Sequence, residues 1–241
     1  MTKSLLAPGL IAPALVLALA GCAPVWGVPI ASGPRVTDDR TIEAVEAVEI
    51  RTSGNLTVTV GDTASLTITA PAASIGRLTS DIVDGVLVLG VSGPQWGWRL
   101  GDIEYELTVP RLSDLAVEGS SDVHADFSGA DDITISIDGS GDVTGTGIDA
   151  DSVTSSISGS GDIELAGRTD RLSFEIDGSG GFGGEDLISR AATVDISGSG
   201  DIDVNATETL DADISGSGDV RYTGGAAVTS DVSGSGSVIE A

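Results

Sequence analysis

The feature that most constrains this chain is an internal repeat of 18 to 20 residues, marked by Gly-Ser-Gly or a close variant. The first glycines of successive units are separated by 20, 20, 19, 20, 18 and 18 residues. They are Gly119, Gly139, Gly159, Gly178, Gly198, Gly216 and Gly234. So short a unit cannot bury an apolar face alone and must stack on its neighbours. The repeat therefore predicts a solenoid or a similar array.

Three columns of mostly aliphatic residues appear when the units are aligned on these glycines. Two residues before the glycine stand Val117, Ile137, Ile157, Ile176, Ile196, Ile214 and Val232. Four residues after it stand Val123, Val143, Ile163, Phe182, Ile202, Val220 and Val238. Four residues before the first column stand Ser113, Ile133, Val153, Leu172, Ala192, Leu210 and Val228. We expect all three columns to face inward, on strands joined by a tight Gly-Ser-Gly-Asp corner, because glycine permits positive φ there.

A parallel β-helix satisfies this pattern, since equivalent residues of successive coils then lie about 4.8 Å apart. The sequence predicts about seven coils over residues 111–241, preceded by an N-terminal β region over 41–110, where alternation at Leu56, Val58 and Val60 indicates strands. The alternative is a sandwich or propeller of antiparallel hairpins, but a propeller blade needs about 40 residues. We therefore expect an all-β solenoid domain over 41–241.

The first 21 residues are typical of an export signal. Lys3 is followed by an apolar stretch over residues 5–20 and by the small residues of Leu19-Ala20-Gly21-Cys22. A retained transmembrane helix is less favoured, because the stretch is shorter than about 20 residues. So is a buried structural cysteine. The tetrapeptide resembles the bacterial lipobox, which implies cleavage between Gly21 and Cys22, a lipid such as palmitate on Cys22, and an extracytoplasmic membrane anchor. Residues 22–40 hold Pro24, Pro29 and Pro34 and are predicted as a tether.

The net charge is −26, and after Cys22 the chain has 10 arginines against 37 acidic residues. Nucleic acid is therefore not expected as a partner, because binding it requires a basic surface. A cell-surface protein or a glycan remains possible as a partner.

Few residues could support catalysis. His124 is the one histidine and Cys22 the one cysteine, so neither a nucleophile triad nor an ordinary zinc site is predicted. His124 is expected to face outward. Asp131 with Asp132, or Asp149 with Asp151, could form the acid and base of a polysaccharide hydrolase. With 37 acidic residues, such pairs also arise by composition, so we favour a protein that is not an enzyme.

An aspartate column follows the corners, at Asp142, Asp162, Asp201 and Asp219. Like charges about 4.8 Å apart would repel, and calcium bound between them, with Ser140 or Ser160, would relieve the repulsion. The favoured alternative is that each aspartate accepts backbone hydrogen bonds in its own turn, with no cofactor. Outside the repeats, Trp96 and Trp98 are candidates for a sugar-stacking loop or for a cap on the solenoid core, and we favour the cap.

The repeats resemble the family of bacterial auto-transporter adhesins with a GIN head domain, on two segments in particular. One is Ser215-Gly216-Ser217-Gly218-Asp219-Val220 with the ending that follows it, and the other is the opening Ser53-Gly54-Asn55-Leu56-Thr57-Val58. The resemblance covers about residues 42–240 and implies a right-handed β-helix, often lipid-anchored, without an assigned activity or binding residues. The chain departs from the family repeat at Gly180-Gly181-Phe182 and at Ser237.

Three functions remain open from the sequence. The favoured one is a non-catalytic envelope lipoprotein that presents an acidic rod for adhesion or surface binding. The second is a structural or stress-related envelope protein without an external ligand, and the third is a β-helix carbohydrate-active enzyme.

Overall fold

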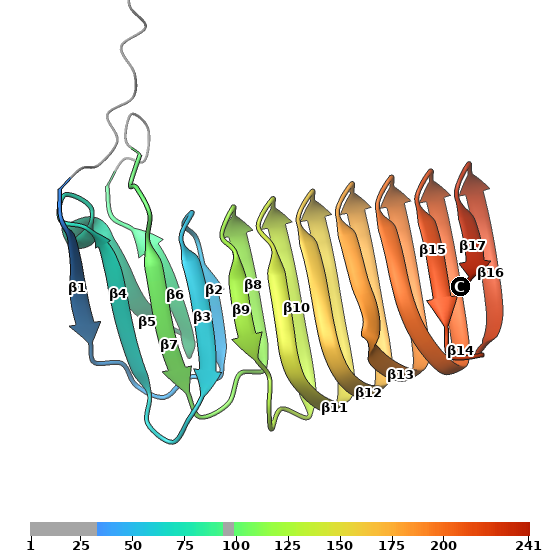
Figure 1. Cartoon of the computed structure of the whole chain (residues 1–241), viewed down its shortest axis with the longest axis horizontal. Coiled ribbons are helices and arrows are strands. Elements are labelled where there is room, and N and C mark those ends of the chain that lie inside the picture. Colours follow the sequence, from blue (N-terminus) through green and yellow to red (C-terminus); the bar gives the residue numbers. More distant parts are fainter. Residues whose placement is uncertain (1–32, 94–98) are drawn as a thin grey trace, which may run out of the picture.

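The protein is a β-solenoid closed at one end by antiparallel strands (Figure 1). The structure, a computed structural model, describes residues 33–93 and 99–241. Within these ranges the chain forms 17 strands in one continuous sheet and a single turn of 3-10 helix, η1 (Ile75–Arg77). The predicted all-β class and parallel solenoid are thus confirmed.

The repeats form the coils of the solenoid. Long strands begin just after one corner, curve round the return and run to the next corner, and every neighbouring pair is parallel. The repeat strands are β8 (Asp114–Gly119), β9 (Val123–Asp126), β10 (Asp132–Gly139), β11 (Val143–Gly159), β12 (Asp162–Gly178), β13 (Gly181–Gly198), β14 (Asp201–Gly216), β15 (Asp219–Thr223), β16 (Ala227–Gly234) and β17 (Ser237–Glu240).

Successive coils are in register at their corners. Gly139 pairs with Gly119 and Gly159, and the same alignment continues to Gly234. Seven stacked corners enclose about six full turns, so the predicted count of about seven coils corresponds to corners and not to complete turns.

The three predicted columns form the core, with exceptions at both ends of the stack. In the middle coils they are buried; Ile157, Ile196 and Ile202, for example, are at most 2% exposed. Ser113 was expected inward but is only half-buried, and its neighbour Leu112 is buried instead. Val228 and Val232 in the last coil are 37% and 39% exposed, because no further strand among the described residues covers them.

A fourth inward column was missed by the sequence alignment. It lies midway between the first and third columns on the same strands, as the two-residue period of a strand requires. Its buried members are Leu115, Ile135, Ser155, Phe174, Val194 and Ala212.

The N-terminal region continues both faces of the solenoid, but in an order that differs from the sequence. Its strands are β1 (Arg35–Arg40), β2 (Ala47–Ile50), β3 (Asn55–Val60), β4 (Ser65–Pro71), β5 (Leu78–Val83), β6 (Val86–Val91) and β7 (Glu104–Val109). On one face β2 lies between β6 and β8, and on the other β3 lies between β7 and β9. Antiparallel strands then end the sheet, with β5 on β6, β4 on β7 and β1 on β4.

Strand β1 corrects one predicted boundary. Residues 35–40 were assigned to the tether, yet all six pair with residues 66–71 of β4. The Arg40 guanidinium also donates hydrogen bonds to the Leu78 carbonyl oxygen at 2.9 Å and to Ser80 Oγ at 3.0 Å. The folded domain therefore includes residues 35–40.

Candidate functional site

Backbone hydrogen bonds join the corners of successive coils and hold the coils together. The backbone N–H of Ser160 donates to the Gly139 carbonyl oxygen of the preceding coil at 2.8 Å. The equivalent serine of each later corner, and Ser140 of the one before, donates in the same way to the preceding coil, as far as Ser235. A Cβ atom on Gly159, where φ is +140°, would overlap the Gly139 carbonyl oxygen. Because the corner backbones are this close, glycine is required there.

The aspartates that follow the corners also link coils. Asp142 Oδ1 accepts a hydrogen bond from the Asp162 backbone N–H at 2.9 Å, and Asp201 Oδ1 accepts one from the Asp219 N–H at 2.9 Å. The favoured interpretation placed these bonds within each aspartate's own turn, whereas they reach the next coil. Over residues 33–93 and 99–241, no group of three or more His, Cys, Asp or Glu side chains is arranged to hold a metal ion.

The departure from the repeat at Gly181 has a structural consequence. Gly181 pairs with Asp162 and Asp201, so one coil lacks the side chain that its neighbours carry. Gly183 likewise lies between Glu164 and Asp203. The missing side chains leave an open hollow of about 580 Å³. Its acidic lining residues are Asp162, Glu164, Glu185, Asp186, Asp201 and Asp203.

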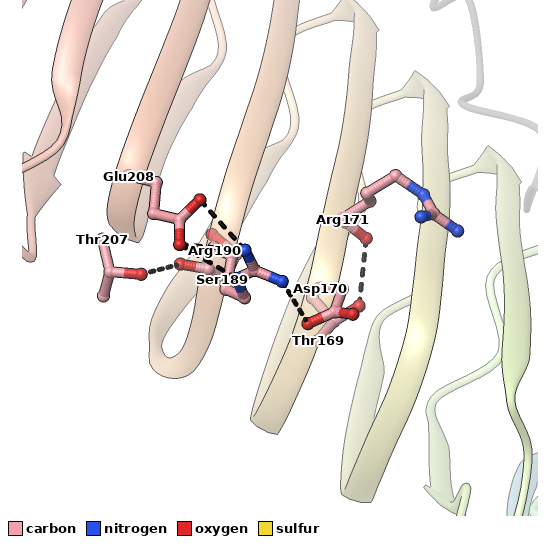
Figure 2. Close-up of polar contacts among 7 residues, drawn as sticks. All are labelled: Thr169, Asp170, Arg171, Ser189, Arg190, Thr207 and Glu208. Atoms are coloured by element: carbon pink, nitrogen blue, oxygen red, sulfur yellow. Dashed lines mark hydrogen bonds and ion pairs between the residues drawn. The ribbon is translucent and has the colours of Figure 1, made fainter.

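Arginines bridge carboxylates of different coils on the acidic surface. Figure 2 shows Arg190 of β13 between Glu208 of β14 at 3.0 Å and Asp170 of β12 at 3.5 Å. Beside it, the Thr207 hydroxyl donates to the Ser189 carbonyl oxygen at 3.0 Å (Figure 2). These carboxylates raise the pKa of Arg190, chiefly through the hydrogen bond with Glu208. Each exposed pair is weak alone, but together they offset repulsion between stacked acidic residues.

The predicted acid and base pairs lie on this exposed surface. Asp131, Asp132, Asp149 and Asp151 are all exposed. The hydrogen bond from the Arg168 guanidinium at 2.7 Å lowers the pKa of Asp149, which is opposite to the raised pKa that a general acid needs. His124 is also exposed, as expected.

A second hollow lies where the first corner meets the N-terminal region. It has a volume of about 780 Å³ and is lined by residues that include Arg51, Arg77, Arg99 and Glu118. Arg51 contacts both Glu49 and Glu118, and the Glu118 contact measures 3.3 Å. Burial, followed by the hydrogen bond with Glu49, raises the pKa of Glu118. This hollow could not be predicted from the sequence, because its arginines are widely separated and follow no motif.

Several predicted residues lie outside the part of the chain that the structure describes. They are Gly21 and Cys22 of the predicted lipobox, and Trp96 and Trp98, which precede β7 in the sequence. In the described ranges, no helix has the length and apolar character needed to cross a bilayer.

Comparisons with known proteins identify the repeat. Residues 45–226 match the family model described as "Putative auto-transporter adhesin, head GIN domain". No curated protein matches significantly.

Solved structures of similar fold come from species of Bacteroides and Parabacteroides. One described as a putative adhesin from Bacteroides fragilis superposes with a TM-score of 0.82 at 23% identity, covering 88% of this chain and 100% of that one. A putative lipid binding protein from Parabacteroides distasonis gives 0.71 at 23% identity, covering 88% and 99%. A putative adhesin from Parabacteroides merdae gives 0.68 at 22% identity, covering 88% and 98%. At these identities the likeness shows a shared fold.

Proposed function

This chain belongs to the family described as "Putative auto-transporter adhesin, head GIN domain", and on that premise we propose that it is a non-catalytic, lipid-anchored envelope module that binds other surfaces. The observation that carries the proposal is family membership over residues 45–226, combined with a rigid rod whose polar side chains are displayed in regular ladders. A rod of stacked coils holds its outward residues at fixed spacing, which suits the recognition of an extended partner.

We do not assign a reaction to the rod. The four aspartates considered for hydrolysis are exposed, and one of them is held by Arg168 in its charged form. A glycosidase acid needs an environment that keeps it protonated near neutral pH. We also propose no calcium site in the aspartate column, because the carboxylates of Asp142 and Asp201 already accept backbone hydrogen bonds.

The anchoring half of the proposal rests on Cys22 and is tested by labelling. Radiolabelled fatty acid should be incorporated into the full-length chain and not into a Cys22→Ser variant, because the lipid is attached through the Cys22 thiol. The wild-type protein should be found in the membrane fraction, and the variant should be released from it. Incorporation of label into the variant would show that the lipid is attached to a residue other than Cys22.

The binding half is tested with the chain from residue 22 onward carrying Cys22→Ser. This start retains β1, which a domain beginning at Thr41 would lack. We expect the labelled protein to bind intact bacteria or isolated envelopes from a panel of species, saturably and in competition with unlabelled protein. An unrelated monomer of similar negative charge serves as the control.

Two other outcomes would each replace the proposal. Absence of saturable binding throughout the panel would favour a structural or stress-related envelope protein with no external ligand. Release of reducing ends from polysaccharides, abolished by Asp149→Asn or Asp131→Asn, would instead show an enzyme.

A further inference from the structure

The hollow of about 780 Å³ at the N-terminal end is the most distinctive concave surface of the molecule; we call it the arginine cavity. Its wall combines the segment after β2, the residue Arg77 of η1, the segment before β7 and the first repeat corner. With Val91 of β6, five pieces of chain that are separate in sequence therefore meet at this point. The volume is within the range of about 300–1,000 Å³ found for small-ligand sites.

The charge of the cavity is opposite to that of the rest of the protein. Three of the 10 arginines that follow Cys22 line it, namely Arg51, Arg77 and Arg99, against two acidic residues, Asp102 and Glu118. The hollow at Gly181 has six acidic residues and one arginine. A third, smaller hollow has four acidic residues beside His124. In a chain of net charge −26, a cavity with more arginines than carboxylates calls for an explanation.

The arginines differ in how they are held. Arg51 is fixed by Glu49 and Glu118, on the neighbouring strands β2 and β8. The Arg77 guanidinium donates a hydrogen bond to the Ser92 carbonyl oxygen at 3.2 Å, which ties it to the end of β6. Arg99 is exposed, and its guanidinium forms no ion pair or hydrogen bond within the described residues. At least one guanidinium is thus available to a ligand, beside two that the fold holds in place.

We propose that the arginine cavity binds a saccharide that carries a carboxylate or a phosphate group. This inference rests on the proposed function and names the class of ligand for it. A guanidinium matches both oxyanions with paired N–H donors. The exposed hydroxyls of Ser53 and Ser120 and the backbone of Gly101 and Gly119 lie in the same wall and can bond sugar hydroxyls.

The cavity fits a saccharide better than an anionic membrane. A lipid surface is flat and extended, whereas these arginines line a hollow surrounded by an acidic protein, which an anionic bilayer would repel. Among the described lining residues, most are polar and only Val91 and Leu100 are large and apolar, so these residues give acyl chains little to contact.

The test measures binding by titration calorimetry to the chain from residue 22 onward with Cys22→Ser. The probes are trigalacturonic acid, phosphorylated maltotriose, unmodified maltotriose, and phosphatidylcholine vesicles containing phosphatidylglycerol. We expect one or both anionic saccharides to bind, with affinity falling as salt rises, and neither maltotriose nor the vesicles to bind. Comparing the carboxylate with the phosphate probe identifies the source of the oxyanion.

The decisive variants are Arg99→Gln and Arg51→Gln. Each should weaken anionic saccharide binding by about tenfold or more, since hydrogen bonds to charged groups are worth about 1.5–3 kcal/mol. Arg99→Gln should leave the melting temperature unchanged, because the exposed Arg99 side chain forms no ion pair or hydrogen bond with the described residues. The matched control is Arg168→Gln, an exposed arginine of the rod that is paired with Asp149 and should leave binding unchanged.

The inference is overturned if neither anionic saccharide binds, if binding survives both Arg99→Gln and Arg51→Gln, or if only the vesicles bind. The same variants are then compared in the envelope-binding assay. Envelope binding without saccharide binding would leave the proposed function standing and remove the cavity's assignment. Absence of envelope binding by the chain without these arginine substitutions would instead contradict the proposed function.

Discussion

Gly159→Ala is expected to lower the free energy of unfolding by more than about 3 kcal/mol, or to prevent folding altogether. Two penalties combine at this corner. The backbone has φ of +140°, which L side chains rarely adopt, and the new methyl group would overlap the Gly139 carbonyl oxygen of the preceding coil. The corner would have to move away, and this would break the hydrogen bond from the Ser160 N–H to the Gly139 oxygen. Urea unfolding followed by circular dichroism measures the loss.

Two control glycines separate these penalties. Gly129 has φ of +82° but open space around its Cβ position, so Gly129→Ala should cost only the strain of about 1–2 kcal/mol. Gly76 has open space and no positive φ, so Gly76→Ala should change stability by less than about 0.5 kcal/mol. If Gly159→Ala were no worse than Gly129→Ala, the corners would not be stacked as closely as the structure shows.

Phe174→Ala is expected to cost about 3–5 kcal/mol of unfolding free energy. Phe174 is 2% exposed, and its ring lies 4.1 Å from that of Phe182, centroid to centroid, with the planes 30° apart. The two rings come from β12 and β13 and meet inside the solenoid. Removing one leaves a void that the hydrogen-bonded coils around it cannot close. Chemical denaturation measures the loss, provided that the slope of unfolding free energy against denaturant concentration is unchanged.

Two comparisons bound this prediction. Phe174→Leu should cost clearly less, because most of the buried volume is retained. Val228→Ala should cost less than about 1 kcal/mol, since Val228 is already 37% exposed in the last coil. Equal losses for Phe174→Ala and Val228→Ala would contradict a core that is sealed in the middle coils and open at the last.

Most of the repeat region could be predicted because its information is local and self-aligning. A residue such as Ile176 stacks on Ile157 and Ile196, its equivalents in the preceding and following units, so that aligning the sequence with itself reproduces the spatial register. The alignment failed where a column loses this regularity. Ser113 is displaced in the first coil, where its backbone N–H bonds the Glu46 carbonyl oxygen of the N-terminal region.

Close packing between different columns could not be read from the repeat. Gly145 pairs with Leu165, and a Cβ atom on it would lie 2.6 Å from the Leu165 side chain and 2.9 Å from the Phe127 ring. Position 145 requires glycine because the ring of Phe127, which lies in another coil and column, occupies the space of a side chain. Nothing in the spacing of the repeat relates these residues.

The candidate sites divide in the same way. The aspartate column was visible in the sequence, but whether Asp142 binds a ligand or the backbone of Asp162 depends on how closely the coils approach. The arginine cavity was not visible at all, because Arg51, Arg77 and Arg99 are brought together only by the N-terminal strands.

The sequence by itself determined the solenoid, the positions of its corners and most of its core, since each unit has to pair with the one before it and only glycine fits the positive φ and close approach at each corner. Only the tertiary structure decided how the solenoid ends. Strand β2 pairs with β8, 67 residues later at Ala47 and Asp114, while β4, β5 and β6 come between them in the chain. Strand pairing over such distances depends on which edges remain unpaired once the other coils have stacked, and no column in the sequence records that order.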